Sequence, residues 1–119
     1  MSDVETRTEP DGTLIIRPHG EIDVERADPF RHLLVHAVRK VRPPRLVVDL
    51  GDVPALDAIH LGTLTALCDV ADDHRVGLVL ANPTAEIRAE LLAAGVAPER
   101  FRYTRDTVSV DTPEVASMS

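Results

Sequence analysis

Two short aliphatic runs separated by a helical segment constrain the fold of this chain more than any other feature. The runs are RLVVDL at residues 45–50 and VGLVLA at residues 76–81. Continuous β-branched and aliphatic runs of this length are typical of strands buried in a parallel sheet. A helix that joins two such strands makes a right-handed crossover, so that the strands lie parallel in one sheet. The sequence therefore predicts an α/β fold.

A β-hairpin is predicted ahead of these strands. Pro10-Asp11-Gly12 is a turn signal, because proline presets φ and glycine adopts positive φ at little cost. The flanking segments Val4–Thr8 and Thr13–Pro18 are predicted to be its two strands. The hairpin adds an antiparallel pair, so we expect a mixed sheet.

A first helix is predicted from Ala27 or Asp28 to about Val41, with Asp28 as its N-cap. Pro43-Pro44 then ends it. The apolar side chains recur with helical spacing and form one face: Phe30, Leu33, Leu34, Ala37, Val38 and Val41.

A further helix is predicted after the run at 76–81. Asn82 is its expected N-cap, Pro83 lies in its first turn, and Gly95 ends it. Residues 101–103 are predicted to form a last short strand.

The expected fold class is α/β, with one domain built on a mixed four- to five-stranded sheet with an N-terminal hairpin and interspersed helices. The chain has 119 residues, which fits a single domain. We expect the domain to span residues 1–110, and residues 111–119 to form a flexible tail because they have no periodicity.

The charge and the apolar patterning exclude several classes of protein. The formal net charge is −7, whereas a nucleic-acid-binding domain usually carries a basic face. No apolar run reaches about 18 residues, so no membrane span is predicted. No charged-then-apolar leader opens the chain, and a cytoplasmic location is expected. The single cysteine, Cys68, is expected to pack in the core.

No set of residues points to catalysis. No serine lies between residues 3 and 108, and no Gly-rich phosphate loop is present. His32 and His36 have the spacing of paired metal ligands but lack a third ligand, so they are expected to be solvated. We therefore expect no enzyme, no cofactor and no metal site.

The helix between the two aliphatic runs, predicted over His60–Asp73, has more apolar surface than one sheet contact needs. One face groups Leu61, Leu64, Leu67, Cys68 and Ala71. A second stripe contains Ile59, Thr63, Ala66 and Val70, bordered by Gly62. Two interpretations stay open. Either a loop covers the second stripe, or the stripe is a groove for a partner, with small residues that permit close approach.

The start of this helix is predicted to be capped by Asp57, whose side chain can accept from N–H groups one turn ahead. Its free N–H groups and its dipole also suit a phosphate on a first-turn side chain. Such a phosphate needs a hydroxyl, and neither Ala58 nor Ile59 has one. His60 could tune binding with pH, but with no evident carboxylate partner it is expected to be a plain surface histidine.

These segments together resemble the STAS domain family, in particular the bacterial anti-sigma factor antagonists. The resemblance rests on GEID at 20–23, LVVDLGDVPALDAIHLGTL at 46–64 and VGLVLANPTAEIRAELLAAGV at 76–96. It implies a mixed sheet of four or five strands with packed helices. It also implies a protein that binds an anti-sigma factor, often a serine kinase of the histidine-kinase-like fold, and so frees a sigma factor.

In that family the kinase phosphorylates a Ser or Thr at the start of the second helix, and an added charge of about −1.5 to −2 weakens docking. The family pattern Asp-Ser-Ser-Gly-Leu-Gly falls on residues 57–62, with the phosphorylated hydroxyl at Ile59. Thr63 is the nearest hydroxyl in the stripe. The resemblance thus implies a docking surface without the usual phosphorylation switch.

The resemblance also implies a set of contact residues. Asp23 matches the acidic loop residue of the family, which lies near the binding surface. The expected partner-binding residues are Asp23, Asp57, Ile59, His60, Gly62, Thr63, Ala66 and Val70. The C-terminal helix of the family is expected to be short or absent, because residues 104–119 lack an apolar helical period and contain a proline.

Two functions remain as alternatives. The first is an anti-sigma factor antagonist without the phosphorylation switch, whose partner is an anti-sigma factor. The second is a non-switching STAS scaffold or accessory subunit of a sensory or transport assembly. A homodimer is a further possibility for either function.

Overall fold

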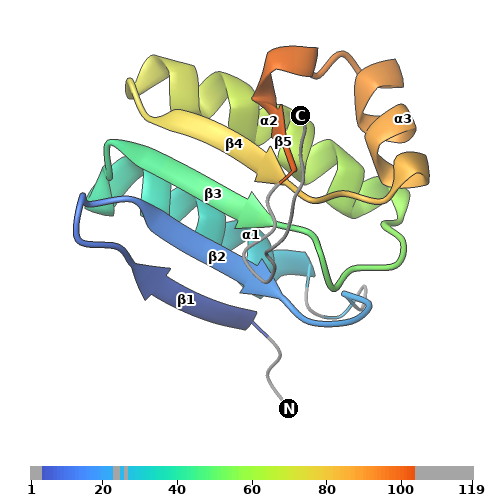
Figure 1. The fold of residues 1–119 in the computed structure, drawn as a ribbon, viewed down its shortest axis with the longest axis horizontal. Helices are drawn as coiled ribbons and strands as arrows, with labels where there is room; N and C mark the ends of the chain where they lie inside the picture. The colour runs from blue at the N-terminus through green and yellow to red at the C-terminus, as the bar shows by residue number, and fades with distance from the viewer. Residues whose placement is uncertain (1–3, 23–24, 26, 104–119) are drawn as a thin grey trace, which may run out of the picture.

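A computed structural model of the chain describes residues 4–22, 25 and 27–103. In chain order the elements are β1 (Val4–Thr8), β2 (Leu14–Pro18), α1 (Ala27–His36), the π-helical turn η2 (Ala37–Val41), β3 (Arg45–Asp49), α2 (Ala58–Asp73), β4 (Gly77–Ala81), α3 (Ala85–Ala93), the 3₁₀ turn η3 (Pro98–Arg100) and β5 (Phe101–Arg102). The strands form one five-stranded sheet in the order β1-β2-β3-β4-β5 (Figure 1). The predicted α/β fold with a mixed sheet is confirmed.

The N-terminal hairpin forms as predicted, because its turn satisfies its own backbone groups. Gly12 adopts a φ of +92° and donates from its N–H to the carbonyl of Glu9 at 2.9 Å. The Asp11 carboxylate accepts from the N–H of Thr13, also at 2.9 Å. β1 and β2 then pair antiparallel, and β2 begins at Leu14, one residue later than predicted.

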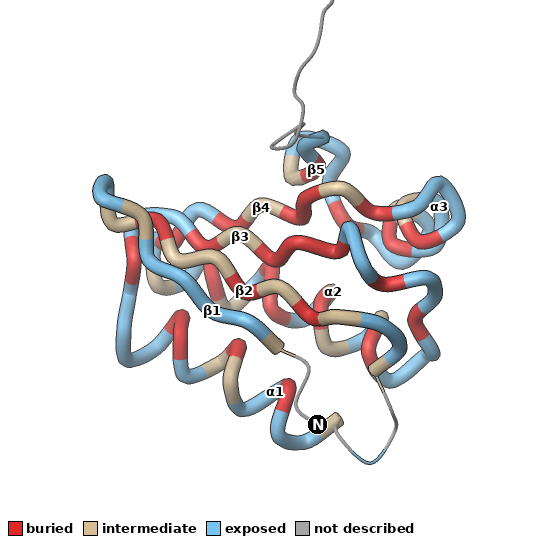
Figure 2. Tube along the Cα trace, turned by 60° about the horizontal axis from the view of Figure 1, so that its bottom comes forward, coloured by how far each residue is buried: buried red, intermediate tan, exposed pale blue. Residues whose placement is uncertain are grey.

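The remaining strands are parallel, and their order decides where the helices lie. β2, β3, β4 and β5 pair in parallel, each with the next strand along the chain. Right-handed crossovers that all advance in one direction place their helices on the same face of a sheet. Figures 1 and 2 show α1 and α2 on one face, while no helix of the described residues covers the other face. The result is a two-layer structure.

The core fills the space between the sheet and these helices. The strand residues that face it are at most 3% exposed: Ile16, Leu46, Val48, Leu78 and Leu80. Alternate residues of the same strands, such as Val47 and Val79, point to the other face and are only partly buried. Figure 2 shows the buried positions concentrated along the central strands and the inner sides of the helices.

The first helix begins at one of its two predicted starts, but the predicted N-cap is wrong. It already begins at Ala27, so Asp28 lies in the first turn and is not the N-cap. Its carboxylate instead accepts from Arg31 at 2.9 Å. The predicted end at Val41 is confirmed, although residues 37–41 form a π turn that closes with the N–H of Arg42 on the carbonyl of Ala37 at 2.9 Å.

The third helix starts later than predicted. Thr84 is its N-cap, and the hydroxyl oxygen of Thr84 accepts from the N–H of Ile87 at 3.1 Å. Asn82 therefore does not cap it; this residue has a φ of +57° and donates from its side chain to Asp49 at 3.3 Å. Gly95, with a φ of +108°, follows the last turn as predicted.

Several expectations fall on residues that the structure does not describe. These are the domain boundary at residue 110, the tail at 111–119, the form of residues 104–119 and the position of Asp23. Among the described residues, every helix is too short or too polar to cross a membrane.

Candidate functional site

The start of α2 is a well-capped helix terminus. Asp57 has an extended backbone (φ −86°, ψ 178°), and its Oδ1 accepts from the N–H of His60 at 3.0 Å, which confirms the predicted N-cap. This backbone hydrogen bond is the largest cause that holds the pKa of Asp57 below its usual value. The ionised carboxylate therefore lies where the helix dipole favours negative charge.

His60 is a core residue, so the prediction of a surface histidine is wrong. Its side chain is 1% exposed, and its ring centre lies 5.9 Å from that of Phe30 in α1. Its Nδ1 donates to Asp57 Oδ1 at 2.7 Å, which fixes the tautomer. Its Nε2 is buried without a hydrogen-bond partner among the described residues.

The helical spacing explains this orientation. α2 begins at Ala58 and not at His60, and His60 lies four residues before Leu64 and seven before Leu67, so it shares the inward face of these core residues. The carboxylate partner that the sequence did not reveal is the N-cap Asp57 itself. A side chain this buried cannot touch a partner in this conformation. It instead holds the capping carboxylate in place.

The second stripe of α2 is open to solvent at its N-terminal half. Ile59 is 51% exposed, and Gly62 and Ala66 are also exposed. A Cβ placed on Gly62 would meet no heavy atom within 4 Å. Thr63 and Val70 are partly buried. The interpretation that a loop covers the stripe therefore fails at Ile59, Gly62 and Ala66.

The opposite face of α2 packs in the core, as predicted. Leu64, Leu67, Cys68 and Ala71 are buried, whereas Leu61 is only partly buried. Burial raises the pKa of the Cys68 thiol, which disfavours the nucleophilic thiolate. Cys68 is thus a packing residue.

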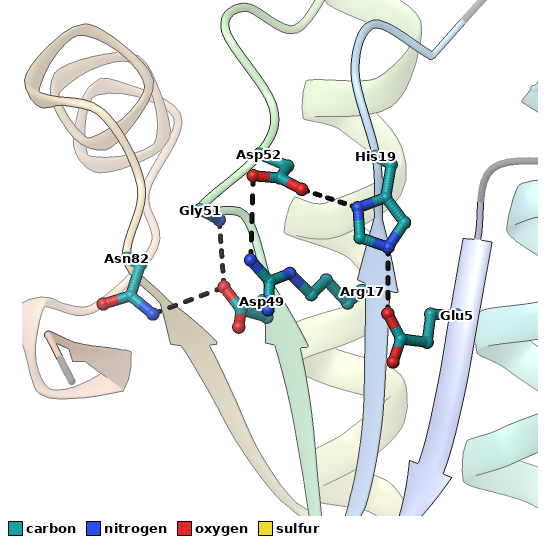
Figure 3. Close-up of polar contacts among 7 residues, drawn as sticks. All are labelled: Glu5, Arg17, His19, Asp49, Gly51, Asp52 and Asn82. Atoms are coloured by element: carbon teal, nitrogen blue, oxygen red, sulfur yellow. Dashed lines mark hydrogen bonds and ion pairs between the residues drawn. The ribbon is translucent and has the colours of Figure 1, made fainter. Parts of the chain in front are cut away.

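The segment between β3 and α2 is held by hydrogen bonds at its start and by buried side chains further along. Asp49, at the end of β3, accepts from the N–H of Gly51 at 2.9 Å and from the side chain of Asn82 at 3.3 Å (Figure 3). Further along, Val53 and Leu56 are buried in the core. These contacts fix the direction in which the chain enters α2.

A cluster of charged side chains at the same end of the sheet was not predicted from the sequence. His19, which follows β2, lies between Glu5 of β1 and Asp52 of the segment after β3, and Arg17 also approaches Asp52 (Figure 3). These residues are distant in the sequence and carry no local pattern. Only the pairing of β1 with β2 and the His19–Asp52 bridge bring them together.

The described residues contain no group of three or more His, Cys, Asp or Glu side chains that could hold a metal ion. His32 and His36 are exposed on α1.

What the start of α2 presents is contact surface: an exposed aliphatic side chain beside small residues, next to a capping carboxylate.

Comparison with known proteins gives one family and a set of similar structures. The STAS domain family model matches residues 5–109. No curated protein sequence matches the chain significantly.

The structural neighbours share the fold at low identity. The anti-sigma factor antagonist SpoIIAA in its unphosphorylated form is 16% identical, with a TM-score of 0.70 over 85% of this chain and 87% of SpoIIAA. The phosphorylated form of SpoIIAA, from Bacillus, is 15% identical, with a TM-score of 0.72 over 85% of this chain and 90% of that protein. A variant of RsbS from Moorella thermoacetica is 16% identical, with a TM-score of 0.69 over 85% of this chain and 85% of RsbS. The STAS domain of a SulP transporter from Vibrio cholerae is 18% identical, with a TM-score of 0.62 over 82% of this chain and 77% of that domain.

Proposed function

The chain belongs to the STAS domain family, and from this premise we propose that it is a non-catalytic, protein-binding regulator that docks on an anti-sigma factor through the start of α2. By occupying the anti-sigma factor it would free a sigma factor in the cytoplasm. Its similarity in fold to SpoIIAA supports this assignment.

The observation that carries the proposal is the exposure of Ile59 beside small residues. A large aliphatic side chain that is 51% exposed loses water-accessible apolar area when a partner covers it. Gly62 and Ala66 lie on the same surface and keep it flat, so a partner backbone can approach closely. The partner-binding surface proposed here consists of Asp57, Ile59, Gly62, Thr63, Ala66 and Val70; Asp23 is proposed for it from the family resemblance alone.

The same position makes docking independent of phosphorylation at this site. Ile59 and Ala58 have no hydroxyl, so a kinase cannot add charge where the resemblance places the phosphorylated residue. Thr63 lies one turn into the helix and is partly buried, which makes it a poor substitute acceptor. We therefore propose a docking surface that stays available while the kinase is active.

A matched pair of arginine substitutions tests this surface. Ala66→Arg places a long charged side chain on the stripe, whereas Ala89→Arg places it on an exposed position of α3. Each tagged variant is used to capture proteins from the native cytoplasm, and serine kinases of the histidine-kinase-like fold are identified by mass spectrometry. The purified kinase is then titrated against each variant by calorimetry.

We expect wild type and Ala89→Arg to bind the kinase equally and Ala66→Arg to lose binding. If Ala66→Arg binds as tightly as wild type, the stripe is not the docking surface. If no variant captures such a kinase, the anti-sigma assignment is wrong.

The likeness to a SulP transporter STAS domain favours one alternative, a scaffold or accessory subunit. This function predicts a stable homo- or hetero-oligomer and no effect on transcription that depends on a sigma factor. Size-exclusion chromatography with light scattering separates it from a monomeric antagonist.

A further inference from the structure

His19 joins three segments of the chain through its two ring nitrogens. Its Nδ1 lies 2.6 Å from Asp52 Oδ2, and its Nε2 lies 2.9 Å from Glu5 Oε1 (Figure 3). A neutral imidazole has one N–H and one lone pair, whereas an imidazolium has two N–H donors. Both contacts can therefore be hydrogen bonds only when the ring is protonated.

Asp52 is held at the same place by its backbone. Its carbonyl accepts from the N–H of Gly20 at 2.9 Å, and residues 19 and 52 form an isolated parallel bridge. From Asp52 the chain continues through buried Val53 and Leu56 to the N-cap Asp57. The His19 contact is thus a side-chain tie between the sheet and the segment that leads into α2.

The charged groups around His19 come from each neighbouring element. β1 contributes Glu5, β2 contributes Arg17, and the segment after β3 contributes Asp52. Arg17 Nη2 lies 3.6 Å from Asp52 Oδ1, so Asp52 keeps one positive neighbour when His19 is neutral. Arg17 also lies opposite Glu5 in the register of β1 with β2. Deprotonation of His19 thus leaves a lone pair facing a carboxylate on at least one side.

The direction of titration follows from these contacts. The hydrogen bond to Asp52, and then that to Glu5, raises the pKa of His19 above its ordinary value of 6.5. Because this pKa is raised, both hydrogen bonds of protonated His19 are present below pH 6.5. They are lost as the pH rises through the folded-state pKa of His19.

We propose that His19 is a protonation-dependent latch that fixes the segment at residues 50–57 to the sheet, and so holds the start of α2 in its docking geometry. The latch itself depends only on this chain. Its consequence for docking rests on the function proposed above: partner binding is stronger at the acidic side of neutrality than at the alkaline side.

The test needs no partner, so that failure of the proposed function cannot be mistaken for failure of the latch. Full-length protein is titrated from acidic to alkaline pH by NMR, following the His19 imidazole and the backbone amides of Val53 and Asp57. Glu5→Gln and Asp52→Asn each remove one carboxylate from His19. Glu9→Gln is the matched control, because Glu9 is in the same hairpin but pairs with Arg7.

We expect the pKa of His19 to exceed 6.5 in wild type and in Glu9→Gln, and to fall toward 6.5 in Glu5→Gln and further in Asp52→Asn. The amides of Val53 and Asp57 should change with the same midpoint as the imidazole, and Asp52→Asn should abolish that change. A wild-type midpoint at or below 6.5, or amides that do not follow the imidazole, would overturn the latch.

Discussion

Replacing His60 by alanine tests whether the start of α2 is held from the core side. The variant loses the hydrogen bond from Nδ1 to the ionised Asp57, whose side chain is 40% exposed. Deletion of a fully buried aromatic ring costs about 3–5 kcal/mol, and imidazole is smaller and partly polar. Because the two contributions overlap, we expect the free energy of unfolding to fall by about 3 kcal/mol. For a domain of this size, that lowers Tm by roughly 10–15 °C.

Chemical denaturation of five variants separates the packing of the His60 ring from its hydrogen bond to Asp57. His60→Phe keeps a ring against Phe30 but cannot donate to Asp57, and His60→Ala loses both contacts. A double-mutant cycle of His60→Ala with Asp57→Ala should give a favourable coupling energy, since the two residues touch directly. The exposed control His32→Ala should stay within about 0.5 kcal/mol of wild type. A loss below about 1 kcal/mol in His60→Ala, or no coupling in the cycle, would refute the assignment of His60 as an anchor.

Three further outcomes follow from the same structure. With a cognate kinase and ATP, wild type should take no label and Ile59→Ser should gain it; stoichiometric labelling of wild type at Thr63 would contradict this. Arg75 follows α2 with a φ of +59°, a conformation that is strained for arginine and favours glycine. Arg75→Gly should therefore raise the free energy of unfolding by about 1 kcal/mol in urea denaturation. A loss of stability would contradict backbone strain at this position. The lowered pKa of Asp57 means that its contribution to stability is present above its unfolded-state value near 3.8 and is lost as pH falls through the folded value. Asp57→Asn should therefore reduce the acid dependence of stability, and an unchanged acid profile would show that the cap does not depend on charge.

The sequence predicted best where the determining interactions are local. The hairpin turn, the N-cap Asp57 and the stop at Gly95 each depend on residues within a few positions of one another, and all three are confirmed. The central strands were predictable because aliphatic runs leave few alternatives to burial in a parallel sheet.

Local signals failed where two candidates competed. Asn82 and Thr84 are both good N-caps, and the tertiary contact of Asn82 with Asp49 decides in favour of Thr84. His60 has the helical spacing of the core face, four residues before Leu64 and seven before Leu67, but its polar side chain suggests a surface position.

The charged cluster could not be predicted, because its members come from three segments. Glu5 and His19 are 14 positions apart, and His19 and Asp52 are 33 apart. No spacing rule links such residues. Their proximity requires the strand order and the register, which only the folded structure supplies.

The one-sided arrangement of helices has a practical consequence for attaching probes. Arg45 is exposed and lines one hollow with Val47 and Val79, on the sheet face opposite to the one that packs against α2. A thiol introduced there by Arg45→Cys would react with maleimide reagents while the native thiol stays shielded. Protein immobilised through that position on a sensor chip would present Ile59 to the flowing solution with a uniform orientation.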